Sequence, residues 1–198
     1  WYQWSPDSRW ILTNYIGTGG WNNKDVALVN ASGNGEIHNL TQSGYNDSGA
    51  KWVLDGKAMI SESDRAGYRS HGSWGAHGDI YIMFFDLEAY ERFLLTKEEL
   101  ALVEEAEKKD EKKEETDKKG KKDTKKEDNK KDEVKPLTFD LENCRDRVVR
   151  LTKHSSSLGD AVLSKKGDKL YYQASFEKGS DLWCQDLKEN STKLILKD

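Results

Sequence analysis

The chain has 198 residues, and its 32 Lys and Arg residues against 36 Asp and Glu residues give a formal net charge of −4. A net acidic chain lacks the unpaired positive charge that phosphate contacts require, so we expect no nucleic-acid partner. No apolar stretch approaches the ~18 to 20 residues of a membrane-spanning helix, and the first residues lack the basic flank and apolar run of a signal peptide. We therefore expect no membrane span.

The charges are distributed unevenly along the chain. Charged residues make up 34% of the sequence, above the ~25% of an average globular domain. The excess lies in residues 104–135, where 32 residues hold 13 Lys and 13 Asp or Glu. This segment has almost no apolar side chain to bury, whereas the remainder has an ordinary composition. The sequence therefore combines a folded body with a Lys- and Glu-rich, low-complexity insertion.

A short pattern recurs in the folded body. Residues 4–12 align with residues 52–60, which lie 48 positions later, and more weakly with residues 163–172. Each copy has an aromatic or aliphatic residue, a tight polar turn and an apolar-rich segment. This pattern predicts a β-hairpin in each copy.

Two further strand patterns follow each predicted hairpin. The first begins with an acidic residue, and the second ends in Leu-Thr in two of the three copies. The acidic residues are Asp25, Asp79 and Asp181; the Leu-Thr pairs end at Thr41 and Thr152, and residues 194–196 take that place in the third copy. Four short strands per unit, at a period in the forties, are typical of β-propeller blades.

We therefore predict an all-β fold of about three four-stranded antiparallel blades, residues 1–41, 45–152 and 156–198. Propellers close with about four to eight blades, and one blade cannot bury both of its faces alone. Three blades form an incomplete propeller. We expect the chain to be a segment of a larger propeller protein, or an open stack that needs capping partners.

The second predicted blade carries an insertion at about residues 86–135. We expect a short helix over residues 87–93, and a capping-box pattern from Thr96 to Glu99 predicts the start of another. Beyond about Lys109 no apolar stripe remains, so we expect a disordered segment or a frayed, solvated helix. The insertion is either a tolerated surface excursion or a docking arm for a partner.

The repeat with its trailing Leu-Thr is similar to the propeller repeat of the Tol-system periplasmic proteins and of tricorn-type serine proteases. The middle unit separates these families, because it resembles the corresponding blade of bacterial tricorn-like proteases. The resemblance covers essentially the whole chain, and the charged insertion also fits the bacterial members. The residues that carry it are 61–75, 79–81, 88–93, 97–99, 139–142 and 147–151.

The resemblance to tricorn-like proteases implies a serine endopeptidase in which propellers precede a PDZ-like module and a C-terminal catalytic core. It implies no cofactor and a homo-oligomer in full length. The implied partners are peptides or unfolded polypeptide and the remaining blades and catalytic domain of the parent protein. It implies a cytoplasmic protein, with a periplasmic or exported one as the alternative. An interaction propeller of the Tol type, with no enzymatic role, remains the second hypothesis.

We expect no catalytic residue within this segment. The sequence contains no Gly-x-Ser-x-Gly nucleophile elbow. His71 lies beside Ser70 and Ser73 in a Gly-rich stretch, but no carboxylate at a meaningful spacing would orient it. The catalytic function that the resemblance implies therefore belongs to a core outside these residues.

The same Gly-rich stretch offers a candidate peptide-binding face. Arg65, Arg69, His71 and Trp74 lie close together in the sequence. An arginine can pair with a peptide carboxylate, and a tryptophan can cover apolar side chains. The alternative is that these side chains pin the loop to its own blade.

A metal site is a weaker alternative in this stretch. His71, His77 and Asp79 are residue types that bind metal ions and could converge on one ion. However, Asp25 and Asp181 open the same strand in the other two units. We therefore favour hydrogen bonding at the start of the strand as the role of Asp79, and we expect no metal.

Aromatic residues and cysteines complete the predictions. We expect Trp4, Trp10, Trp52 and Trp183 to pack between blades, where each large side chain removes apolar area from water. The two cysteines, Cys144 and Cys184, lack zinc-site spacing and are too few for a disulfide framework. We expect both to be buried or half-buried free thiols.

Overall fold

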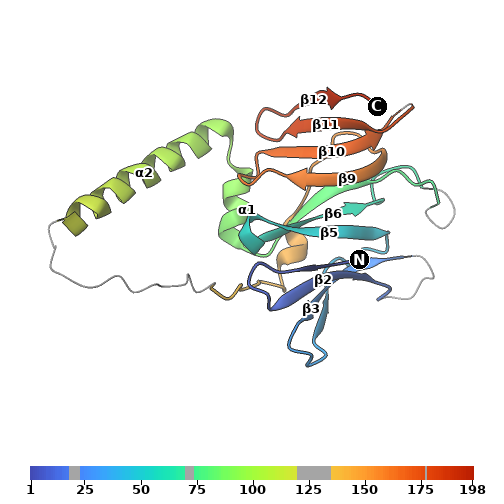
Figure 1. Ribbon diagram of the computed structural model, residues 1–198, viewed down its shortest axis with the longest axis horizontal. Helices are drawn as coiled ribbons and strands as arrows, with labels where there is room; N and C mark the ends of the chain where they lie inside the picture. Colours follow the sequence, from blue (N-terminus) through green and yellow to red (C-terminus); the bar gives the residue numbers. More distant parts are fainter. Residues whose placement is uncertain (18–22, 70–73, 120–134, 177) are drawn as a thin grey trace.

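The computed structural model describes residues 1–17, 23–69, 74–119, 135–176 and 178–198, with the backbone alone for residues 110–119. Within these residues the chain forms three four-stranded antiparallel sheets, and in each sheet neighbouring strands follow chain order. Figure 1 shows the sheets stacked on one another, with the second sheet between the first and the third. The chain is therefore an all-β protein built of propeller-type blades.

Each sheet corresponds to one predicted unit. Blade 1 contains β1 (Tyr2–Trp4), β2 (Trp10–Tyr15), β3 (Asp25–Asn30) and β4 (Ile37–Asn39). Blade 2 contains β5 (Asp47–Val53), β6 (Ala58–Ser63), β7 (Asp79–Phe84) and β8 (Val148–Arg150). Blade 3 contains β9 (Ser157–Leu163), β10 (Lys169–Ser175), β11 (Asp181–Asp186) and β12 (Ser191–Leu196).

The predicted hairpins are present, and two of their turns contain a hydrogen bond from a serine hydroxyl to an aspartate. The Ser5 hydroxyl donates to the Asp7 carboxylate at 2.6 Å and accepts from the Trp10 backbone N–H at 2.9 Å. The Ser164 hydroxyl donates to Asp168 at 2.6 Å in the third hairpin. Serine and aspartate hydrogen-bond readily to nearby backbone groups, which explains why this polar pattern makes a turn.

In blades 1 and 2, the acidic residue that opens the third strand joins that strand to the threonine after the fourth. The Thr41 hydroxyl donates to Asp25 at 3.2 Å, and the Thr152 hydroxyl donates to Asp79 at 2.6 Å. The prediction that Asp79 hydrogen-bonds at the start of its strand is confirmed. The prediction that the outer strands end in Leu-Thr is wrong, because both threonines lie two residues beyond β4 and β8. Their side chains turn inward to these buried carboxylates instead.

Two apolar clusters hold the blades together. One lies between blades 2 and 3, and the other lies between blades 1 and 2. A fully buried aliphatic or aromatic side chain contributes about 1.5–3 kcal/mol relative to exposure. The principal buried members are Ile60, Ile82, Phe84, Leu170 and Tyr172 in the first cluster, and Leu12, Val26, Leu28, Met59, Met83 and Phe85 in the second.

Three of the four tryptophans expected between blades contact these clusters. Trp10 and Trp52 pack against the second cluster, and the Phe139 ring lies between them at centroid distances of 5.4 Å and 5.8 Å. Trp183 packs against the first cluster. The prediction for Trp4 is wrong. It is 50% exposed, because it lies on the side of β1 that faces away from blade 2.

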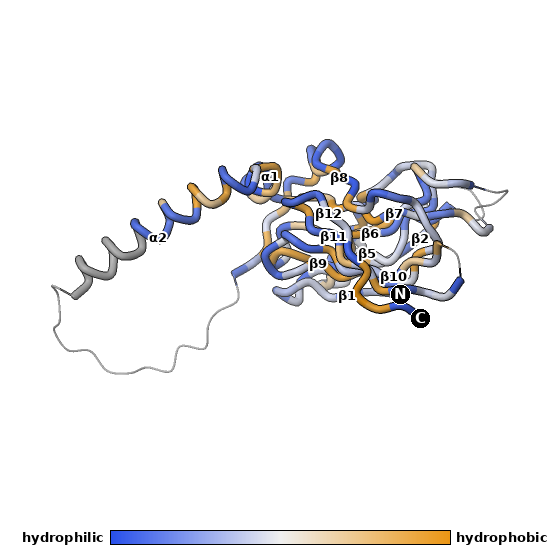
Figure 2. Tube along the Cα trace, turned by 90° about the horizontal axis from the view of Figure 1, so that it is seen from above, coloured by the Kyte–Doolittle hydropathy of each residue, from blue (hydrophilic) through white to orange (hydrophobic). Residues whose placement is uncertain are grey.

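The insertion begins with the two predicted helices, α1 (Leu87–Leu94) and α2 (Lys97–Lys119). The capping box is confirmed, because Glu99 accepts from the Thr96 backbone N–H at 2.8 Å and Thr96 accepts from the Glu99 N–H at 3.2 Å. Figures 1 and 2 show α2 projecting away from the sheets. Its helical backbone continues past Lys109 to its last residue. Residues 120–134, where disorder was also expected, lie outside the described residues.

The return of the insertion packs against the hairpin turns of blades 1 and 2. The Leu137 backbone N–H donates to Asp7 at 2.8 Å, and a Cβ added to Gly56 would meet the Leu137 side chain at 2.6 Å. The Arg147 guanidinium, 6% exposed, pairs with Asp140 at 2.9 Å. The insertion therefore leaves from blade 2 and returns across the boundary with blade 1.

Cys144 is buried and Cys184 is half-buried, and both are free thiols, as expected. Burial raises the pKa of the Cys144 thiol. Among the described residues, no helix has the length and apolar character needed to cross a membrane.

Candidate functional site

The two ends of the sheets carry different connections. In blade 2, Ser63 pairs with Asp79, so the β6–β7 connection lies at one end of the sheet. Ala58 pairs with both Val53 and Phe84, so the hairpin turn and the start of the insertion lie at the other. We call the described residues of 64–78, together with Tyr45, the loop face. This face contains three of the four residues predicted to bind peptide.

Two glycines allow the chain to pass closely at the base of the loop face. The His77 backbone N–H donates to the Tyr68 carbonyl at 2.8 Å. A Cβ on Gly67 would collide with the His77 carbonyl oxygen, and one on Gly78 would collide with the Glu62 carboxylate. Glycine is required at position 67 because another backbone segment lies against it, whereas at position 78 the nearest atoms belong to the Glu62 side chain.

Arg65 is directed into its own blade. Its guanidinium pairs with the fully buried Asp47 at 3.1 Å, and its Nε donates to the Ser63 hydroxyl at 2.9 Å. The guanidinium also lies over the Tyr81 ring, 4.7 Å from the centroid. A buried carboxylate needs such a partner, since burial without one is costly. Arg65 therefore neutralises Asp47.

Arg69 lies closer to solvent, with a side chain that is 36% exposed. Its Nε lies 3.5 Å from the carboxylate of Asp64, and its guanidinium lies 4.7 Å from the centroid of the Tyr45 ring. Asp64 also accepts from the Asn46 backbone N–H at 3.0 Å. The terminal nitrogens of Arg69 make no hydrogen bond to a described residue, so they remain available for a ligand.

Arg150 forms a third arginine–aspartate pair at this end of blade 2. It lies 2.8 Å from the fully buried Asp79, which also accepts from Thr152 and, at 2.6 Å, from Ser155. Asp79 therefore has several protein partners, and this supports a role in fixing the strand rather than in binding a metal. Among the residues that the structure describes, no group of His, Cys, Asp and Glu is placed to hold a metal ion.

Glu62 is the carboxylate at this end that has no arginine partner. It receives no hydrogen bond from a described residue, and burial, together with the nearby charges of Asp64 and Asp79, raises its pKa. Desolvation and like charge both favour the neutral acid. Glu62 therefore binds a proton more tightly than an exposed glutamate.

Aromatic side chains extend the loop face into solvent. Tyr68 is 65% exposed and Trp74 is 66% exposed, and the Tyr68 ring lies 6.0 Å from the His77 ring. Tyr68 and Trp74 therefore add exposed apolar area to the loop face.

The predicted site residues thus differ in their surroundings. Arg65 faces an internal carboxylate, Arg69 and Trp74 reach the surface, and His71 lies outside the described residues. The sequence interpretation did not identify Tyr45 or Tyr68 as part of this face. Tyr68 could have been found from its place beside Arg69, whereas the ring of Tyr45 comes from another connection.

Comparisons with known proteins identify the fold. No protein-family model matches the sequence, and no curated protein is similar to it. The crystal structure of TolB from Acinetobacter baumannii is similar to 98% of the chain, with a TM-score of 0.52 and 17% sequence identity. The crystal structure of the tricorn protease is similar to 98% of the chain, with a TM-score of 0.58 and 10% identity. The chain spans 31% of the TolB chain and 18% of the tricorn chain. Both neighbours are propeller proteins, and the chain has the fold of a β-propeller segment.

Proposed function

We propose that the chain is a non-catalytic propeller segment of a tricorn-like serine endopeptidase, with blade domains at residues 1–41, 45–152 and 156–198. In this role it helps to select, gate or channel peptides toward a catalytic core elsewhere in the parent protein. The likeness to the tricorn protease agrees with the proposal. The resemblance of the middle blade to bacterial tricorn-like proteases also supports it.

The loop face is the observation that carries the proposal. Arg69 offers its terminal nitrogens to a peptide carboxylate or carbonyl, and the exposed Tyr68 and Trp74 offer apolar area. Hydrogen bonds from a guanidinium together with aromatic contacts are typical of interfaces that hold a polypeptide. His71 lies in the same stretch of the sequence but outside the described residues, and its part in peptide binding stays a prediction.

The outward faces of blades 1 and 3 support further blades as partners. Each carries exposed apolar side chains on the side turned away from blade 2, and no other described element covers them. These residues are Tyr2, Trp4 and Ile37 on blade 1, and Val162, Tyr171 and Leu196 on blade 3. Contiguous exposed apolar surface marks interaction sites, and blade-on-blade packing is how propellers bury such faces.

A Tol-type interaction propeller is the alternative function. The likeness to TolB favours it as much as the likeness to the tricorn protease favours the first proposal. In this case the loop face and the outward faces would bind a folded protein, with no associated chemistry. A periplasmic location would suit this alternative. For the tricorn-like peptidase we propose a homo-oligomer that is either cytoplasmic or exported.

Labelling with a fluorophosphonate probe separates the two functions. The probe reacts with an activated serine nucleophile. We expect the parent protein to be labelled at a serine outside this segment, and the 198-residue chain to stay unlabelled. A parent protein that is folded and unlabelled, and that cleaves no peptide, would support the Tol-type role instead.

A further inference from the structure

The outer strand of blade 3 forms a free edge of its sheet. β12 is the last strand in the order β12-β11-β10-β9, and no described strand pairs with its other side (Figure 1). All six of its residues are exposed. The equivalent strands of blades 1 and 2, β4 and β8, have three residues each. Short edge strands limit pairing with other chains, and blade 3 lacks this protection.

This edge would stay open in a complete propeller. The blades pack on one another through the faces of their sheets, where the two apolar clusters lie. A further blade beside blade 3 would therefore cover one face of β12 and leave the backbone N–H and C=O groups along its outer side unpaired. The edge is a different surface from the loop face and from the outward faces of blades 1 and 3.

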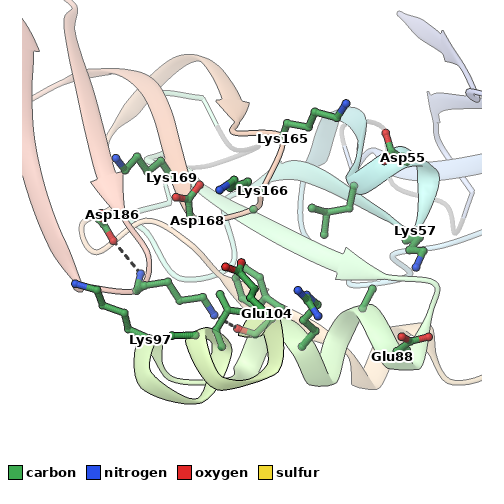
Figure 3. A pocket seen from close by; sticks show the side chains of 18 of the residues that line it. Asp55, Lys57, Glu88, Lys97, Glu104, Lys165, Lys166, Asp168, Lys169 and Asp186 are labelled. Atoms are coloured by element: carbon green, nitrogen blue, oxygen red, sulfur yellow. Dashed lines mark hydrogen bonds between the residues drawn. The ribbon is translucent and has the colours of Figure 1, made fainter. Parts of the chain in front are cut away.

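The start of β12 is fixed to the insertion. The turn before the strand and the helices α1 and α2 line one cavity (Figure 3). In this turn the Lys188 ammonium donates to the carbonyls of Phe93 and Leu95, at 2.6 Å and 2.8 Å, and Glu189 pairs with Lys97. The insertion therefore holds the turn from which β12 begins.

The end of β12 is fixed to the start of β11. The Asp198 backbone N–H donates to the Asp181 carboxylate at 3.1 Å, and the Asp198 carboxylate accepts from the Ser180 N–H at 3.4 Å. Within the strand, the Thr192 hydroxyl donates to Gln185 at 2.6 Å. A segment that is already held in place loses little conformational freedom when it binds a partner. β12 is therefore a preformed edge.

The side chains of the edge follow a symmetric pattern. Residues 193–197 read Lys-Leu-Ile-Leu-Lys, so their order is the same in both chain directions. All five are exposed, and the two lysine ammonium groups make no ion pair or hydrogen bond with a described residue. The edge therefore presents an apolar run with unpaired positive charge on either side of it.

The described acidic side chains near β12 have other partners. Asp181 and Asp186 lie in β11 and accept backbone hydrogen bonds at the two ends of β12. Glu189 pairs with Lys97, and Asp198 accepts the N–H of residue 180. The positive charge at the edge is therefore available to a ligand.

We propose that β12 binds an extended polypeptide segment as a fifth strand of blade 3, and that this segment has an apolar run flanked by acidic residues. In strand addition, backbone hydrogen bonds provide the affinity and side chains provide the specificity. The apolar residues of the segment lie opposite residues 194–196, and its carboxylates lie opposite Lys193 and Lys197. Because the pattern of the edge is symmetric, a parallel and an antiparallel segment need the same sequence.

A second copy of the chain is a poorer match for this edge. Two β12 strands that pair antiparallel around Ile195 would place Lys193 of each chain opposite Lys197 of the other. Like charges directly opposite each other destabilise a strand pair, and edge lysines oppose self-pairing in this way. The charge of the edge therefore favours an acidic segment of another chain.

Fluorescence anisotropy and hydrogen exchange of the 198-residue chain test the proposal together. The probe is a capped peptide of three valines flanked on each side by one glutamate and one serine, and a second peptide has lysines in place of the glutamates. We expect the glutamate peptide to bind at least about tenfold more tightly, and more weakly at high salt. It should slow exchange in residues 191–197 and leave residues 64–69 and 74–78 of the loop face unchanged.

A third peptide separates strand addition from charge attraction alone. It is the glutamate peptide with two consecutive valines N-methylated, which removes a backbone donor on each side of the strand. We expect it to bind at least about tenfold more weakly than the unmodified peptide. Equal binding would show that no backbone pairing occurs and would overturn the proposal.

Charge-reversal variants locate the binding. Lys193→Glu with Lys197→Glu should reverse the preference, so that the lysine peptide binds more tightly than the glutamate peptide. Lys165→Glu with Lys166→Glu is the matched control, because both lysines are exposed on the β9–β10 turn of the same blade, and it should keep the original preference. An unchanged preference in the first variant, or a reversal in the control, would contradict binding at β12.

Three other outcomes would also overturn the proposal. If neither peptide binds, the lysines serve only to prevent self-pairing. Slower exchange in the loop face without a change in β12 would place the peptide at the loop face, and the function proposed for that face would stand. Protection of β12 in the free chain that rises with chain concentration would show that a second copy occupies the edge.

Discussion

At the scale of single residues, charge pairing dominates the loop-face end of blade 2. Asp47, Asp64 and Asp79 are buried, and each has an arginine partner. Removing one member of a buried pair leaves an uncompensated charge, which costs more than the pair contributes. Arg65, Arg69 and Arg150 therefore each balance the charge of a buried aspartate at this end of blade 2.

Asp79→Asn tests the structural role of the aspartate that opens β7. The variant keeps the shape but loses the charge that Arg150, Thr152 and Ser155 face, so we expect a loss of about 2–4 kcal/mol in the free energy of unfolding. Urea denaturation measures it. Asp181→Asn is the control at the same strand position in blade 3, where Asp181 is half-exposed and accepts from the Asp198 N–H at 3.1 Å. A loss at Asp79 no larger than in the control would contradict this role.

Glu62 predicts a pH-dependent difference in stability. Its folded pKa lies above its ordinary value, so the folded state binds the proton more tightly than the unfolded state. The stabilising contribution of Glu62 to the free energy of unfolding is fully present below the ordinary pKa of glutamate. It is lost as the pH rises through the raised pKa of the folded state. Glu62→Gln cannot ionise and should escape that loss.

Urea denaturation of both proteins at pH 4 and pH 7 checks this expectation. The two proteins differ only at residue 62, so the difference in their stability reports the ionisation of Glu62. The stability of the variant relative to the parent chain should therefore increase from pH 4 to pH 7. A constant difference across this range would rule out a raised pKa at Glu62.

At the scale of elements, the insertion is attached by its two ends. Its return places Phe139 between the tryptophans of two blades and beside Phe85, at a centroid distance of 5.2 Å. Its start is held by the contact of Lys188 with the end of α1. These contacts explain how a blade carries a long charged segment and keeps the packing of its neighbours.

Phe139→Ala should lower the free energy of unfolding by about 2–4 kcal/mol, because it opens a cavity beside Trp10 and Trp52. Thermal unfolding followed by tryptophan fluorescence is a suitable measurement. Phe176→Ala provides the comparison, since Phe176 is 46% exposed and its removal should cost less than about 1 kcal/mol. Equal destabilisation by the two substitutions would show that the return segment does not join blades 1 and 2.

The sequence was most informative where structure depends on local contacts. The hairpin turns and the capping box of α2 each involve residues that are close in the chain, and the acidic starts of β3, β7 and β11 were found because they recur at the same place in each unit. The contact of Phe139 with Trp10 and the pairing of Arg65 with Asp47 depend on the arrangement of distant segments, which periodicity does not encode. The exposure of Trp4 was missed for a related reason, because a strand pattern does not show which face a neighbouring blade covers.

At the scale of the whole molecule, the outward faces of blades 1 and 3 carry exposed apolar side chains that a further blade would cover. Trp4→Ser with Leu196→Ser should lower self-association of the chain and leave its melting temperature nearly unchanged, because both side chains are at least half exposed. Light scattering and thermal unfolding test the two expectations. Trp52→Ser, at the boundary of blades 1 and 2, should lower the melting temperature. A melting temperature of the double variant as low as that of Trp52→Ser would contradict this expectation, because it would show that Trp4 and Leu196 are packed inside the folded chain.

The central claim is that the loop face binds peptides that a catalytic core outside this segment cleaves. The most direct measurement compares kcat/KM of the parent protein for a long peptide and for a short chromogenic substrate, with and without Arg69→Ala and Trp74→Ala. We expect kcat/KM for the long peptide to fall about tenfold or more in the variants. We expect kcat/KM for the short substrate to change little, because a short substrate does not need the propeller. Unchanged kcat/KM for both substrates in the folded variant would contradict it.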